Sequence, residues 1–102
     1  MRTPVSPLVV TATDAKIDRA READLLAGFR AINAGEVPDG VIRTELLRGQ
    51  NDLWRIQTTW RDLDSVRAVR ASGKPPVMQD LLTSLGAEAT HDFFVIEALR
   101  EL

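Results

Sequence analysis

The sequence predicts an α+β fold in which a four-stranded antiparallel sheet carries its helices on one face. Four short segments are rich in β-branched and aromatic residues, and helical patterns follow the first and the third of them. The order is therefore strand, helix, strand, strand, helix with a further short helix, and strand. This is the order of the ferredoxin-like split βαβ arrangement.

A single domain is predicted over residues 8–102, after an extended tail at residues 1–7 that contains two prolines. The first strand is expected from Leu8 to about Asp14, where valine and threonine predominate. Asp18 is a good N-cap for a helix over residues 19–34. One stripe of that helix is apolar and consists of Leu25, Leu26, Phe29 and Ile32.

Strands are expected at residues 41–48 and 53–60, joined as a hairpin by the turn cluster Gly49-Gln50-Asn51-Asp52. Asp62 can cap a second helix over residues 63–71, and a short helix is expected over residues 77–85. Residues 90–99 contain Phe93-Phe94-Val95-Ile96 and predict a last, well-buried strand.

Composition excludes several classes of function. A net charge of −2 argues against binding to the nucleic-acid backbone. The absence of cysteine excludes disulfides, thiolate zinc sites and iron–sulfur clusters, and the lone histidine, His91, excludes a metal site built on two imidazoles. No apolar run approaches the roughly 20 residues of a membrane span. A cytoplasmic protein without a cofactor or metal is expected.

The face of the sheet opposite the helices predicts a second copy of the chain. The last strand is apolar on both faces, and the chain has no further element to cover the second one. A homodimer with the sheets packed face to face is the simplest cover. The alternative is a monomer with a mostly polar open face. Five residues on the predicted non-helical faces could form a polar site inside the dimer barrel or, as the favoured interpretation, cross-strand and intersubunit ion pairs: Arg43, Glu45, Arg55, Gln57 and Glu97.

From about Leu8 to Leu99, the chain resembles the antibiotic biosynthesis monooxygenase (ABM) family. The resemblance rests on the turn Val37-Pro38-Asp39-Gly40 and on Thr58-Thr59-Trp60-Arg61-Asp62-Leu63-Asp64-Ser65-Val66, in this order and spacing. It implies a dimeric α/β barrel with a pocket between the sheet and the helices of each subunit. Implied activities are cofactor-free oxygenation of polyketide-type hydroquinones and quinols and, in one branch, haem degradation.

The chain departs from both branches of the family. The haem-degrading branch has an Asn on the first strand and a Trp and a His in the helical region; the corresponding regions here offer Thr11 and Thr13, and Arg70 and Gln79. Haem degradation is therefore not expected. The polyketide oxygenases place an Asn and a Tyr around their Trp, whereas here Ile56 precedes Trp60 by four residues and tyrosine is absent. Only Trp60 carries over.

Two residues are candidates for catalysis. Trp60 can stack on a planar substrate and donate its indole N–H, and His91 is the natural general base near neutral pH. Both have a structural alternative, because Trp60 also fits a core position and strand alternation places His91 with Phe93, on the face expected to meet the partner. The substrate pocket is expected to be lined by Trp54, Ile56, Thr58, Thr13, Phe29 and Phe94.

The sequence thus predicts a cofactor-independent monooxygenase-like protein that acts on a small aromatic, quinol or polyketide-type substrate. The alternative is a non-catalytic dimeric domain of the same fold that binds a small molecule or has a structural role. An enzyme needs a polar group within hydrogen-bond reach of the space beside Trp60, and a binding domain does not.

Overall fold

The structure is a computed structural model that describes residues 7–100. The predicted order of elements is confirmed, whereas most of the tail predicted at residues 1–7 lies outside the described residues. The elements are β1 (Val9–Lys16), η1 (Arg19–Arg21), α1 (Glu22–Asn33), β2 (Val41–Arg48), β3 (Leu53–Trp60), α2 (Leu63–Ala71), α3 (Val77–Ser84) and β4 (Thr90–Val95).

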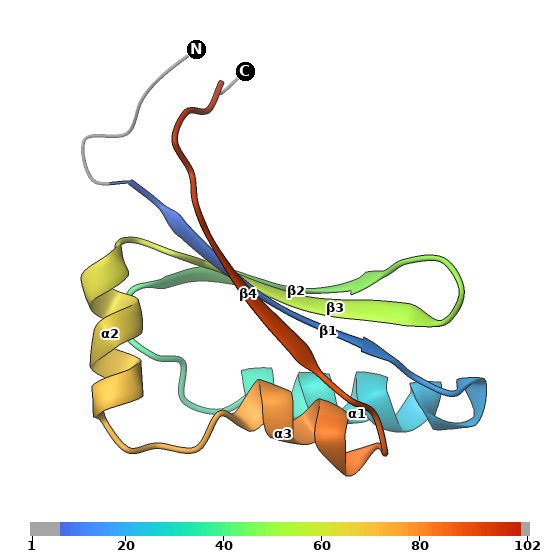
Figure 1. The fold of residues 1–102 in the computed structure, drawn as a ribbon. Helices are drawn as coiled ribbons and strands as arrows, with labels where there is room; N and C mark the ends of the chain where they lie inside the picture. The colour runs from blue at the N-terminus through green and yellow to red at the C-terminus, as the bar shows by residue number, and fades with distance from the viewer. Residues whose placement is uncertain (1–6, 101–102) are drawn as a thin grey trace.

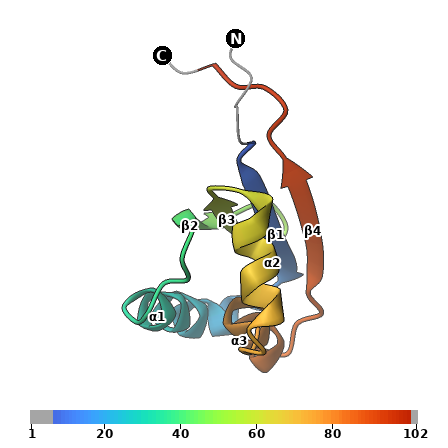
Figure 2. The same ribbon diagram turned by 90° about the vertical axis from the view of Figure 1, so that its left-hand side faces the viewer.

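The strands form one antiparallel sheet in the order β2-β3-β1-β4 (Figure 1). The three α-helices lie on the same side of this sheet (Figure 2). The ferredoxin-like arrangement predicted from the sequence is therefore confirmed. None of the helices in residues 7–100 is long and apolar enough to cross a membrane.

Local sequence signals explain where the elements begin and turn. Asp18 accepts a hydrogen bond from the backbone N–H of Ala20 at 2.9 Å, and the first helical segment starts as a 3₁₀ turn before α1. Asp62 caps α2 by accepting from the backbone N–H of Ser65 at 2.8 Å. At the hairpin tip, Asn51 and Asp52 both have positive φ, a backbone conformation that Asn and Asp adopt more readily than most residues with a side chain.

The main core lies between the sheet and helices α1 and α3. Trp54 and Ile56 of β3 pack there with Leu25 of α1 and Leu82 of α3, and all four are buried. A smaller cluster joins Trp60 to Val9 and to Val66 of α2. The even-numbered face of β3 thus packs under the helices, as its more apolar character predicts. Between the two clusters the helices spread apart (Figure 1).

The last strand differs from its prediction in length and burial. It ends at Val95 rather than near Leu99, and every residue from Thr90 to Val95 is exposed. The physical reason is its position: β4 is an edge strand that pairs only with β1. An apolar pattern shows that a strand is suited to burial, but no element within residues 7–100 covers β4.

Candidate functional site

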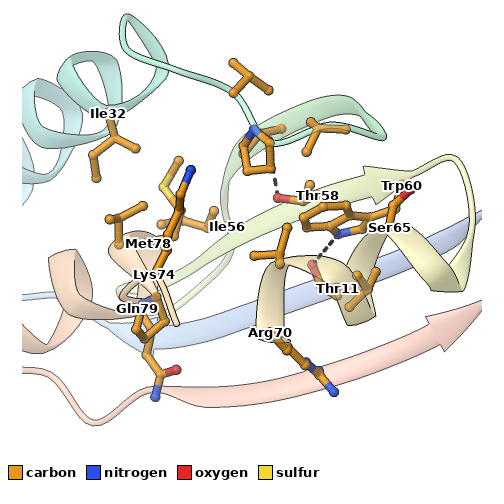
Figure 3. A pocket seen from close by; sticks show the side chains of 18 of the residues that line it. Thr11, Ile32, Ile56, Thr58, Trp60, Ser65, Arg70, Lys74, Met78 and Gln79 are labelled. Atoms are coloured by element: carbon orange, nitrogen blue, oxygen red, sulfur yellow. Dashed lines mark hydrogen bonds between the residues drawn. The ribbon is translucent and has the colours of Figure 1, made fainter. Parts of the chain in front are cut away.

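A cavity of about 680 Å³ lies between the sheet and the helices. Its floor comes from β1, β2, β3 and the start of β4, and its walls come from the end of α1, the loop before β2, helix α2 and the start of α3 (Figure 3). This volume falls in the range of pockets that hold small organic ligands. The predicted pocket between the sheet and the helices therefore exists.

Threonine hydroxyls form a polar row across the cavity floor. Thr44 of β2 is paired with Thr58 of β3, which is paired with Thr11 of β1. Their side chains share the helix-facing side, and the hydroxyls of Thr44 and Thr58 lie 3.2 Å apart. The cavity floor is thus apolar carbon interrupted by one line of hydroxyl groups.

Trp60 stands at one end of this row. Its indole N–H donates to Oγ1 of Thr11 at 3.0 Å, and the ring borders the cavity although the residue is only 7% exposed. Figure 3 shows the ring and the Thr11 hydroxyl together on the cavity side of the sheet. Trp60 is therefore both a packing residue against Val66 and a wall of the cavity.

His91 enters the cavity from the edge strand. Its register partner on β1 is Thr13, and Nδ1 of the imidazole lies 2.9 Å from Oγ1 of Thr13. Both side chains line the cavity. The expectation that His91 faces a partner subunit is wrong: pairing with Thr13 puts the odd-numbered residues of β4 on the helix side. Because β4 is apolar on both faces, alternation within the strand could not choose between them.

The structure brings together five of the predicted site residues, which are Thr13, Ile56, Thr58, Trp60 and His91. Three others do not line this cavity. Trp54 and Phe29 belong to the main core, where the close packing of α1 on β3 fills the space around them. Phe94 pairs with Val10, so it points to the opposite face of the sheet, where 49% of it is exposed. The prediction of these three as pocket residues is wrong.

Several cavity residues were missed by the sequence analysis. Thr11 and Thr44 carried a signal: Thr11 lies two residues from Thr13, which was expected in the pocket, and Thr44 alternates with Arg43 and Glu45, which were expected on the open face. Ser65, Lys74 and Met78 carried none, since their place depends on how α2, α3 and the loop between them lie over the sheet. Period-two patterns locate residues on strands, whereas residues of the helical layer come to a site through tertiary packing.

Charged side chains of both signs lie on the rim of the cavity. Glu36 and Asp39 come from the loop before β2, and Asp39 is 3.4 Å from the guanidinium of Arg61. Arg70 and Lys74 come from the end of α2 and the loop that follows it. Glu36, Arg70 and Lys74 reach into solvent and form no ion pair with another of residues 7–100. Because the rim carries both signs of charge, it does not favour a ligand of one charge.

The open face of the sheet has its own polar pairs. Arg55 contacts Asp14 through two hydrogen bonds of 2.7 and 2.9 Å, and this bidentate contact lowers the pKa of Asp14. Arg43 lies 3.2 Å from Glu45, two residues along the same strand β2. Arg55 therefore forms the predicted cross-strand ion pair, whereas Arg43 and Glu45 pair within one strand. The predicted fifth member of this set, Glu97, lies beyond the end of β4.

Comparison with solved structures defines the class of fold. No protein-family model matches the sequence, and no curated protein matches it. The fold is that of antibiotic biosynthesis monooxygenase structures. A candidate enzyme of that kind from Deinococcus radiodurans superposes with a TM-score of 0.66 at 18% identity, covering 92% of this chain and 95% of the other.

Two further structures have stated activities. SnoaB of Streptomyces nogalater, a cofactor-independent oxygenase, has 21% identity and a TM-score of 0.59 over 95% of this chain and 97% of its own. A haem-degrading protein of Mycobacterium tuberculosis has 18% identity and a TM-score of 0.65 over 94% of this chain and 98% of its own. At these identities the likeness establishes the fold.

Proposed function

We propose that this protein is a cofactor-independent monooxygenase that acts on a small, electron-rich aromatic, quinol or polyketide-type substrate. The observation that carries the proposal is the cavity of about 680 Å³, whose largely apolar walls enclose a hydroxyl row, an indole and one imidazole. The similarity in fold to SnoaB supports it. A cofactor-free oxygenase needs such a site, because the substrate itself must reduce oxygen in a dry pocket.

The proposed reaction balances with dioxygen as the oxidant. A hydroquinone that has a ring C–H reacts with one O₂ to give a hydroxyquinone and one water. Removal of a phenolic proton creates the electron-rich anion, which passes an electron to O₂, and the resulting radicals combine to form the new C–O bond as a hydroperoxide. Cleavage of its O–O bond leaves one oxygen on the ring and releases the other as water. The substrate supplies all the electrons.

In this proposal, His91 removes the phenolic proton, and Thr13 positions the imidazole ring of His91. When Nδ1 carries the imidazole proton and donates to Thr13, Nε2 has a free lone pair and can accept a proton. Trp60 provides a flat surface for the aromatic ring, and its own N–H is held by Thr11. All of these residues line the cavity.

The alternative function is non-catalytic binding of a small apolar molecule. The exposure of His91 on an edge strand favours this alternative, because a general base in bulk water loses the advantage of a dry site. The two functions differ in turnover: both predict ligand binding, and only the enzyme predicts oxygen consumption that depends on His91.

The test is oxygen uptake with 1,4-dihydroxynaphthalene, corrected for the rate without protein. H91Q is expected to lower the protein-dependent rate by about 10²–10⁴-fold, the usual contribution of a general base. D92N is the matched control, because Asp92 is the next residue of β4 and pairs with Ala12 on the opposite face. Equal rates for wild type and H91Q would contradict the role of His91, and no protein-dependent uptake would favour the binding function.

A homodimer through the open sheet face is part of the proposal. Phe94 of β4, Leu47 of β2 and Leu53 of β3 are exposed large apolar residues, and the register of the strands puts all three on that face. Exposed apolar surface of this kind marks an interaction site. Sedimentation at micromolar concentration is expected to give twice the chain mass, and F94D is expected to give the mass of one chain. The cytoplasmic location stays a prediction.

A further inference from the structure

The hydrogen bonds of the cavity floor indicate which chemical group a ligand should present there. An indole N–H is a donor only, so Oγ1 of Thr11 must be the acceptor in its 3.0 Å contact with Trp60. The proton of the Thr11 hydroxyl is then directed elsewhere. Within residues 7–100, no hydrogen bond donated by Thr11 is found. Thr11 therefore offers an unused donor at the cavity floor.

Thr58 offers a second donor beside it. In the 3.2 Å contact between Thr44 and Thr58, one hydroxyl donates and the other accepts, which leaves one of the two protons without a partner. When Thr44 donates to Thr58, the Thr58 proton is free to point into the cavity. A donor that itself accepts a hydrogen bond is polarised and becomes a stronger donor.

The two donors are close enough to bind the same atom. Thr11 and Thr58 are directly paired across β1 and β3, and side chains paired in this way have Cβ atoms about 4.5–5.5 Å apart. Both side chains border the cavity, next to the Trp60 ring (Figure 3). The row contains hydroxyl groups and no carboxylate, so no negative charge within it opposes the binding of an anionic oxygen.

We propose that Thr11 and Thr58 form a two-hydroxyl site that binds a phenolate or enolate oxygen of an aromatic ligand whose ring lies against Trp60. The inference rests on the proposed function in taking this cavity as the ligand site. It names what the substrate must present, which is an anionic oxygen on a flat ring. Two hydroxyl donors stabilise the anion more than the neutral phenol, and the anion is the form that reacts with oxygen.

The experiment compares two probes of nearly equal shape. 4-Nitrophenol ionises to a phenolate that absorbs visible light, and 4-nitroanisole carries a methyl group on the same oxygen. Titration of the full chain is expected to show the phenolate bound at least tenfold more tightly than the ether, with the pKa of bound 4-nitrophenol lowered. T11V and T58V are each expected to weaken phenolate binding by about tenfold and to leave ether binding unchanged.

Rescue and control variants separate this role from a structural one. T11S and T58S keep a hydroxyl and are expected to restore the phenolate preference. T59V is the matched control, since Thr59 is adjacent in β3 and faces the other side of the sheet. T58V leaves the contact between Trp60 and Thr11 intact, so it tests the site even if T11V does not fold.

Three results would overturn the inference: no preference for the phenolate, an equal loss for both probes in T11V and T58V, or no binding of either probe. Neither probe is a hydroquinone, so their binding is independent of oxygenation. A phenolate preference without any oxygen uptake would leave this site intact and reject the proposed reaction. Oxygen uptake without the preference would do the reverse.

Discussion

Replacing Gly40 with alanine tests the contact between the loop before β2 and helix α2. Gly40 has φ +91°, a conformation that residues with a side chain rarely adopt. A methyl group built on it would overlap the side chain of Ser65, which borders the cavity. The carbonyl of Gly40 also accepts a hydrogen bond from the backbone N–H of Arg61 at 2.8 Å, so the backbone has little freedom to move away.

The expected loss of stability has two parts. The positive φ costs an alanine about 1–2 kcal/mol, and forcing a methyl group into an occupied space costs about 1–3 kcal/mol more. Together, G40A is expected to lower the free energy of unfolding by about 2–5 kcal/mol. This is a large part of the roughly 5–15 kcal/mol that stabilises a typical domain.

The measurement is urea unfolding followed by tryptophan fluorescence, with G73A as the matched control. Gly73 has φ +74°, and no heavy atom lies within 4 Å of the methyl group that alanine would add. G73A is therefore expected to cost only about 1–2 kcal/mol. Equal losses in the two variants would refute the overlap with Ser65, and full stability of both would refute the argument from φ.

Three further predictions follow from other parts of the structure. Because Arg55 lowers the pKa of Asp14, the pair contributes stability that is present above the pKa of an unfolded aspartate and is lost as the pH falls through the lower pKa of the folded state. The difference in unfolding free energy between wild type and D14N should therefore shrink on acidification. A difference independent of pH would contradict this. In W54F the remaining Trp60 borders the cavity, so 1,4-naphthoquinone should quench it saturably, whereas in W60F the core residue Trp54 should show no saturable quenching. Haemin should give no saturable shift of its Soret band in H91A, since the helices beside the cavity carry no histidine and His91 is the one imidazole of the chain; a saturable shift that persists in H91A would overturn this.

The order and type of the elements could be predicted because each depends on neighbours in sequence. Asp62 caps α2 wherever that helix lies, and the turn at Asn51 and Asp52 closes the hairpin by local geometry. The alternation of β3 likewise placed Ile56, Thr58 and Trp60 on one face. Local backbone preferences and one apolar face suffice for such predictions.

The site could be predicted only in part, for reasons that particular residues make plain. Trp54 and Trp60 share the same face of β3, yet α1 packs on the first and leaves the second beside a cavity. His91 and Phe94 were assigned to the wrong faces, because β4 is apolar on both sides and its orientation depends on pairing with Thr13 and Val10. Neither outcome is a property of the strand alone.

The split βαβ sheet and its tryptophan face under the helices follow from the amino-acid sequence alone, because strand period, helix period and turn residues are short-range properties. Which side chains meet in the cavity depends instead on long-range contacts. Contact between Trp60 and Thr11, and between His91 and Thr13, joins residues far apart in the chain through strand register. Register and helix placement are set by packing across the whole domain, and the chemistry of the site depends on both.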